Sequence, residues 1–327
     1  MENNKKLTEI DYSPLVTLDS YNRRKLIAVV FTMVIPFLLL LISQVVFFHS
    51  GVDFNEASSI YYFAFIIAFS VAYFLLRNIE VVKNKEWKNF AKNNAWKIAE
   101  ISVDDAYFIP PGIYGVGRGR KVSSVISAVY EGHVCDVFIY QYTIGVGRNR
   151  RTYYYTIARV RLEKAFPHLI LDSKHSWSIT KRGDATELVK LEGNFANDFT
   201  LYYRSGENID ALSIITPDVM RAVQQKSKYQ DIEVIDKSMF FILTSDRRNA
   251  NDVKLLLESV DIVVDEIKHK QTTLNYVPEV SEDDRISAIV KSNSSLGRKV
   301  SRSLGSIILY VIYGVVFILI TVGMLTK

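Results

Sequence analysis

Residues 122–160, VSSVISAVYEGHVCDVFIYQYTIGVGRNRRTYYYTIARV, decide the fold that we expect for this chain. Apolar or β-branched residues alternate with polar ones in three runs, a pattern typical of β-strands. The runs are Val122–Tyr130, Val134–Tyr142 and Thr152–Val160. The short turn 131–133 predicts a tight hairpin between the first two runs, and the glycine-bearing loop 143–151 joins the next two. The sequence therefore predicts an antiparallel meander that is rich in tyrosine.

Further strands and helices are expected on both sides of this meander. Residues 77–94 form a basic helix that either lies on the membrane surface or packs on the domain. Thr216, Pro217 and Asp218 are typical of a helix start, and we expect that helix to run to about Lys226. A second helix begins near Asn251, because its apolar residues share one face. The remaining predicted strands are Leu169–Leu171, Leu188–Glu192, Phe199–Tyr203, and a pair, Ile232–Ile235 and Met239–Leu243, that turns at Asp236 and Lys237. Gln271–Ser281 is expected to be a linker and Glu282–Val290 a short amphipathic helix.

Three stretches contain no Asp, Glu, Lys, Arg or His. They are Leu26–Phe48, Ala57–Leu76 and Ser303–Thr326. A bilayer core of about 30 Å requires about 20 apolar residues of helix, and each stretch reaches that length. The sequence therefore predicts three transmembrane α-helices.

Basic residues beside these stretches set the expected orientation in the plasma membrane. Lys and Arg occur in the N-terminal tail and on both flanks of the large central segment, whereas the loop 49–56 has neither. Because positive residues stay in the cytoplasm, we expect the tail and the central segment inside and the loop outside. The predicted organisation is a cytoplasmic tail (1–25), a transmembrane hairpin (26–76), a cytoplasmic α+β domain (77–302) and a C-terminal transmembrane helix (303–327).

Composition excludes several classes of protein. The chain has 327 residues, 49% of them hydrophobic, and Cys135 is its only cysteine, so it is neither a wholly soluble enzyme nor a disulfide scaffold. Cys135 lies in an alternating stretch and is expected to be a small packed residue. The net charge of +5 is largely explained by the residues that flank the spans. We therefore expect no nucleic-acid partner, although base stacking on the tyrosines is an alternative.

Two segments nearly repeat each other, YGVGRGRK at 114–121 and IGVGRNRR at 144–151. Together they carry six basic residues, Arg118, Arg120, Lys121, Arg148, Arg150 and Arg151. Glycine-rich turns expose backbone amides that can hold anions, and each Lys or Arg near an anionic leaflet contributes about 1 kcal/mol. Neither segment matches a nucleotide-binding loop. The segments are candidates for binding lipid headgroups or an acidic protein, and the alternative is two solvated loops.

His168, Asp172 and His175 are the compact set with metal-ligand chemistry. Their spacing matches no established zinc site, and surface histidines at a strand end are the alternative. No catalytic motif such as H-E-x-x-H or G-x-S-x-G occurs. We therefore expect neither a catalytic centre nor a cofactor.

Phe199–Leu243 resembles a bacterial family of membrane-anchored proteins whose shared domain has no assigned function. The resemblance rests on an Ala-x-x-Ile-Leu-Thr-Pro-x-x-Met helix start between a Phe/Tyr strand and an "FFIL" strand pair. The matching residues are Phe199, Tyr202, Ala211, Ile214, Ile215, Thr216, Pro217 and Met220. Leu212 and Ser213 stand where such family members often have a basic and an aromatic residue. The resemblance implies membrane anchoring and supplies no catalytic residue.

These observations predict a non-enzymatic binding module at the inner leaflet, with an anionic lipid or an acidic protein as its partner. Two other interpretations stay open from sequence. A membrane-tethered enzyme would use His168, Asp172 and His175, and an accessory subunit of a transport complex would rely on the membrane spans.

Overall fold

The computed structural model describes residues 4–15, 81–99, 109–114, 116–176, 186–189, 191, 193–204 and 212–271, with single positions between 26 and 70 and at 276. The three predicted spans, the linker 271–281 and the helix 282–290 thus lie outside the described residues, apart from those single positions and Gln271. Within the described part, no helix is both long enough and apolar enough to cross a bilayer.

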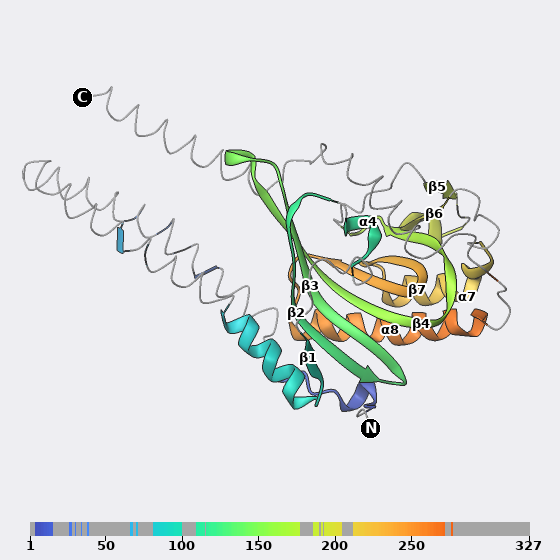
Figure 1. Cartoon of the computed structure of the whole chain (residues 1–327), viewed down its shortest axis with the longest axis horizontal. Coiled ribbons are helices and arrows are strands. Elements are labelled where there is room, and N and C mark those ends of the chain that lie inside the picture. The colour runs from blue at the N-terminus through green and yellow to red at the C-terminus, as the bar shows by residue number, and fades with distance from the viewer. Residues whose placement is uncertain are drawn as a thin grey trace, which may run out of the picture.

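The described residues form an α+β domain built on a seven-stranded antiparallel sheet, as the sequence predicts (Figure 1). The strands are β1 (Lys97–Ala99), β2 (Arg118–Tyr130), β3 (His133–Ile144), β4 (Arg151–Ser173), β5 (Thr186–Val189), β6 (Phe199–Arg204) and β7 (Asp231–Thr244). The helices are η1 (Leu7–Glu9), a helix over 81–93, α4 (Pro111–Tyr114), η3 (Gly147–Asn149), α5 (Phe195–Asp198), α7 (Pro217–Lys226) and α8 (Ala250–Gln271).

Strand β4 is the centre of the sheet. Its first half pairs with β3, its last residues pair with β6, and β7 follows nearly its whole length. The meander predicted from residues 122–160 is confirmed, because β2, β3 and β4 pair in chain order.

Two predicted breaks in the strands are wrong. The pair turned at Asp236 and Lys237 is the single strand β7, and the runs predicted separately at 152–160 and 169–171 are the single strand β4. Asp236 has φ of +49°, and the register between β4 and β7 shifts on both sides of Phe166. The extra residues of β4 on both sides of Phe166 form bulges opposite Asp236. Both strands therefore continue where the charged residues suggested a turn.

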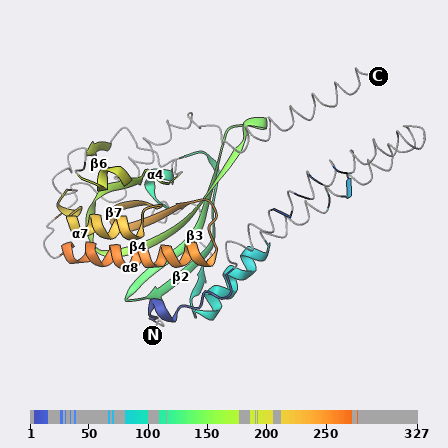
Figure 2. The same ribbon diagram turned by 180° about the vertical axis from the view of Figure 1, so that it is seen from behind.

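Both faces of the sheet are covered. Helices α7 and α8 lie along one face, and α4 lies over the other (Figures 1 and 2). Alternate residues of β7 follow this division: Phe241 belongs to the core beneath α8, while Phe240 and Ile242 belong to the core beneath α4. Burial on both faces explains why residues 239–243 read MFFIL, an apolar run without alternation.

The tyrosines of the meander belong to the core beneath α4. Tyr140, Tyr142 and Tyr155 are fully buried, and the hydroxyl groups of Tyr142 and Tyr155 are hydrogen-bonded at 3.0 Å. These rings are packed within the protein and are not available to stack on bases. Cys135 is also fully buried, and burial raises the pKa of its thiol.

The helix over 81–93 packs on the domain, which decides between the two interpretations of this segment. Trp87, Phe90 and Ala91 are buried against the core, and Trp87 Nε1 donates to the Ser124 carbonyl at 2.6 Å. Ion pairs hold the start of the helix. Lys83 pairs with Asp246 at 3.1 Å. Arg248 donates to both carboxylate oxygens of Asp246, from Nε and from one terminal nitrogen, each at 2.8 Å.

Residues 4–15 also belong to the domain. The Glu131 carboxylate in the β2–β3 turn accepts from the Leu7 amide at 2.7 Å, and Asn94 at the end of the helix over 81–93 accepts from the Asp11 amide at 2.9 Å. Ile10 and Leu15 are buried in the core. This part of the predicted N-terminal tail is therefore an ordered edge of the domain.

Candidate functional site

The two basic segments meet at one end of the sheet. In the strand register Arg118 lies opposite Thr143, and Thr143 lies opposite Thr152, one residue after Arg151. The start of β2 therefore runs beside the turn that joins β3 to β4. We call residues 118–121 and 144–151 together the basic tip; they include all six basic residues singled out in the sequence.

Glycines shape the turn of the basic tip. Gly145 has φ of +82°, and a Cβ placed there would lie 2.3 Å from the Asn149 carbonyl oxygen. Only glycine combines that backbone conformation with so close an approach. The following residues form the short helix η3, so the chain reverses within a few residues and returns as β4.

Backbone carbonyls hold two of the arginines. Arg118 donates to the Gly145 carbonyl at 2.7 Å, which joins the two basic segments directly. Arg120 donates to the Tyr114 carbonyl at 2.8 Å, and its guanidinium lies 5.0 Å from the centre of the Tyr114 ring. Both side chains are exposed, and each guanidinium has five N–H donors, so other donors of Arg118 and Arg120 are directed to solvent.

The other basic residues extend this surface. Lys121 is exposed opposite Gln141, Arg150 is exposed at the end of the turn, and Arg151 is half-buried at the first position of β4. The backbone of Arg148 lies in η3. A guanidinium group can bind two oxygen atoms of a phosphate or carboxylate at once.

An exposed apolar residue lies in the turn of the basic tip, and its exposure was not visible in the sequence. Val146 is 73% exposed, whereas Val116, which occupies the equivalent position of the near-repeat, is 1% exposed. The two segments share Gly-Val-Gly-Arg but have different neighbours: one enters a strand beneath α4, and the other is a hairpin turn. Residue identity alone cannot distinguish a buried valine from an exposed one.

His168, Asp172 and His175 do not form a site. His168 Nε2 lies 2.9 Å from Glu233 in the core, whereas His175 Nε2 lies 2.8 Å from Asp198 near the surface. Asp172 lies opposite Thr200 on β6. Among the residues that the structure describes, the group of three side chains that could hold a metal ion is a different one, His133, Asp261 and Asp265.

No protein-family model matches this chain, and no curated protein matches it. Among solved structures, the chain is similar to the mycobacterial trehalose monomycolate transport factor A, TtfA, with 13% sequence identity and a TM-score of 0.43 over 60% of this chain and 98% of that one. A likeness of this degree carries no conclusion about fold or function. The family resemblance of Phe199–Leu243 therefore stays a prediction.

Proposed function

We propose that this chain is a membrane-anchored, non-enzymatic binding module whose basic tip contacts anionic lipid headgroups at the inner leaflet. The observation that carries the proposal is the meeting of two basic segments around the exposed Val146. Basic side chains attract an anionic surface, and an apolar side chain among them can enter the boundary between headgroups and acyl chains.

Contacts of the N-terminal segment support the anchoring part of this proposal. Residues 4–15 pack against the helix over 81–93: the Tyr12 and Phe90 rings stack at 5.8 Å, and Asn93 donates to the Asp11 carboxylate at 2.9 Å. Residues 4–15 and the helix over 81–93 are in contact, so both lie in the same compartment. The chain between these two segments can then cross a membrane only an even number of times, which agrees with the two apolar stretches in that interval.

The direction of the basic tip also supports the proposal. In Figures 1 and 2, the β3–β4 turn and the end of the 81–93 helix away from β1 both lie on the same side of the domain. That helix end follows the second predicted span by only a few residues. A domain held there would present its basic tip on its membrane side.

A fluorescent label at position 146 tests the contact. We would introduce Val146→Cys in the full-length chain, attach an environment-sensitive dye, and reconstitute the protein in nanodiscs. Cys135 is buried, with its thiol pKa raised by burial, so the new thiol would react selectively. We expect a blue-shifted emission and quenching by lipid-borne quenchers when anionic lipid is present, and a smaller effect in zwitterionic lipid.

Charge variants provide the matched comparison. Arg118→Ser, Arg150→Ser and Arg151→Ser together should abolish the anionic-lipid effect, because they remove charge from the basic tip. Replacing the same number of exposed basic residues elsewhere should leave it unchanged; the control is Arg161→Ser, Lys237→Ser and Lys254→Ser. Equal emission in the two lipids, or equal loss in both triple variants, would contradict lipid contact and favour an acidic protein as the partner.

A further inference from the structure

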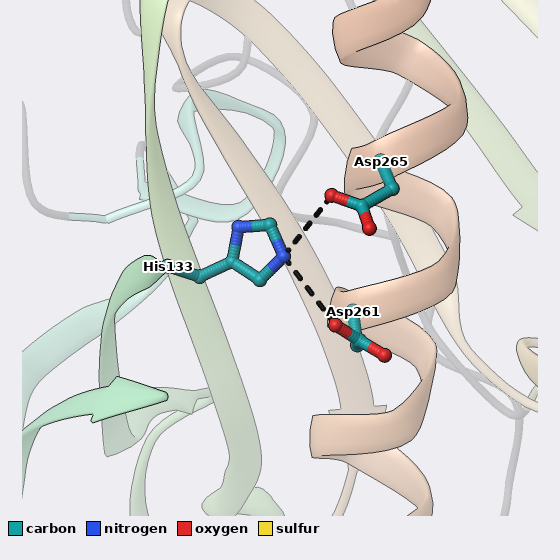
Figure 3. A group of neighbouring side chains, drawn as sticks. All are labelled: His133, Asp261 and Asp265. Carbon is teal, nitrogen blue, oxygen red and sulfur yellow. Dashed lines mark ion pairs between the residues drawn. The ribbon is translucent and has the colours of Figure 1, made fainter. Parts of the chain in front are cut away.

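His133, the first residue of β3, faces two aspartates that lie one turn apart on α8 (Figure 3). Its Nε2 lies 3.3 Å from Asp265 Oδ1 and 3.5 Å from Asp261 Oδ1. All three ligand atoms lie within 4.8 Å of one another. The spacing of the aspartates is that of positions i and i+4, so the helix directs both carboxylates to the same place.

The imidazole is the buried member of this group. The His133 side chain is 1% exposed, yet its Nε2 has no hydrogen-bond partner among the residues that the structure describes. Buried polar atoms are nearly always hydrogen-bonded. Here Nε2 lies at ion-pair distance from two carboxylates and hydrogen-bonds to neither, so the three groups could share a bound ion.

The carboxylates are also crowded. A carboxylate oxygen of Asp261 and one of Asp265 lie within 4.8 Å of each other. Two negative groups held this close repel each other, and a bound cation would relieve the repulsion.

The distances fit a tetrahedral ion. Zinc(II) binds imidazole nitrogen and carboxylate oxygen at about 2.1 Å, and tetrahedral angles then separate the ligand atoms by about 3.4 Å. The observed separations from Nε2, 3.3 and 3.5 Å, lie on either side of that value. We propose that His133, Asp261 and Asp265 bind a divalent first-row transition-metal ion of the zinc(II) class, with a fourth position open to water. One nitrogen and two carboxylates suit such an ion better than magnesium or calcium, which prefer a shell of oxygen atoms.

Lys268 is the competitor for this site. Its Nζ lies 3.1 Å from His133 Nδ1, so without an ion the ammonium donates to Nδ1 and Nε2 carries the imidazole proton. An ion bound to Nε2 would move the imidazole proton to Nδ1. The Nδ1–H group of His133 and the ammonium group of Lys268, both donors, would then face each other. Lys268 is only half-buried, so its flexible side chain can turn to solvent when the ion binds.

The bound ion would join the β2–β3 turn to α8. That turn is also the place where residues 4–15 dock, through Leu7 on Glu131 and Asn4 on Gly132. The metal site is thus independent of the basic tip, and failure of either proposal leaves the other intact.

Calorimetric titration of the full-length protein tests the site directly. The protein, purified in detergent without a histidine tag and treated with a chelator, would be titrated with zinc(II), and the absorption spectrum would be recorded with cobalt(II). We expect one ion per chain and the visible bands of a four-coordinate cobalt(II) centre. Absence of saturable binding would overturn the proposal.

Variants assign the ligands. Replacing an outer-shell partner typically costs 10- to 100-fold in metal affinity, so Asp261→Asn and Asp265→Asn, which remove direct ligands, should each lower zinc affinity by at least about 100-fold. Lys268→Met should raise zinc affinity about tenfold, because it removes the cation that competes with the ion at His133. A purely structural role of the aspartates would not produce this rise. Asp265 is 59% exposed, so its replacement should not impair folding.

The other histidine–aspartate pair supplies the control. His175 and Asp198 form an ion pair at 2.8 Å without a second carboxylate ligand in the described residues, so His175→Gln should leave zinc affinity unchanged. Affinity that falls in His175→Gln, or that is unaffected in both aspartate variants, would overturn the assignment.

Discussion

Glu233 shows how a single side chain joins the α4 segment to the sheet. It is fully buried on β7, accepts the Gly112 amide at 3.0 Å, and lies 2.9 Å from His168 Nε2 on β4. A Cβ at Gly112 would lie 2.8 Å from a Glu233 oxygen, so the residue in α4 must be small. The carboxylate thus attaches the α4 segment to the centre of the sheet.

Removing this carboxylate should destabilise the domain. Glu233→Ala removes the carboxylate that a buried imidazole and a buried amide share, and breaking a buried pair of this kind costs about 3 kcal/mol. Denaturant unfolding of the full-length protein in detergent, followed by the fluorescence of the buried Trp87 and Trp96, measures the change. Glu163→Ala on the exposed side of β4 should change stability by less than about 0.5 kcal/mol. A similar loss in both variants would show that Glu233 has no special role.

The elements depend on one another through a comparable polar group, Lys83, Asp246 and Arg248. It attaches the helix over 81–93 to the loop between β7 and α8, and Arg248 also donates to Ser124 on β2 at 3.0 Å. Burial opposes the charge of Asp246, but its hydrogen bonds and charge interactions with Arg248, together with Lys83, hold the pKa of Asp246 below its ordinary value of 3.8.

This pKa predicts how stability varies with pH. A carboxyl group whose pKa is lowered by folding contributes stability that is complete above pH 3.8 and is lost as the pH falls below that value. Asp246→Asn should therefore cost about 3 kcal/mol at pH 7, because Arg248 stays buried without its anion. The deficit should shrink on acidification below pH 3.8, and denaturant unfolding at several pH values measures it. A deficit that is constant with pH would exclude the charge as its cause.

Much of the arrangement of elements could be predicted from sequence. The β2–β3–β4 meander and the starts of α7 and α8 follow from alternation, turn residues and capping, which are local properties. The continuity of β4 and β7 could not be predicted, because the bulges of β4 opposite Asp236 depend on pairing between distant segments. The basic residues of the candidate site were visible in the sequence, but the exposure of Val146 was not, since the same letters bury Val116. His133 lies more than a hundred residues from Asp261 and Asp265 in sequence, so the sequence did not suggest the group.

At the scale of the whole molecule, the contacts between residues 4–15 and the helix over 81–93 constrain topology most strongly. The proposal places this domain in the cytoplasm and the loop 49–56 outside. The basic residues beside the apolar stretches set that orientation, and the packing requires only that both segments share a compartment.

Thiol labelling of intact cells tests the orientation. Ser50→Cys in the outer loop should react with a membrane-impermeant maleimide, whereas Leu188→Cys, on the exposed side of β5, should react only after the membrane is permeabilised. The native Cys135 is buried and should stay unlabelled in both variants. Labelling of Leu188→Cys in intact cells would place the domain outside and remove the inner-leaflet proposal.

The docking of residues 4–15 on the β2–β3 turn also orders events during synthesis. Its receptors, Glu131 and Gly132, leave the ribosome more than a hundred residues after Leu7 and Asn4. By then the apolar stretches between residues 26 and 76 have already been translated. If these stretches span the membrane, as proposed, they would enter it before residues 4–15 can dock, and closure of the domain would be a late step of biogenesis.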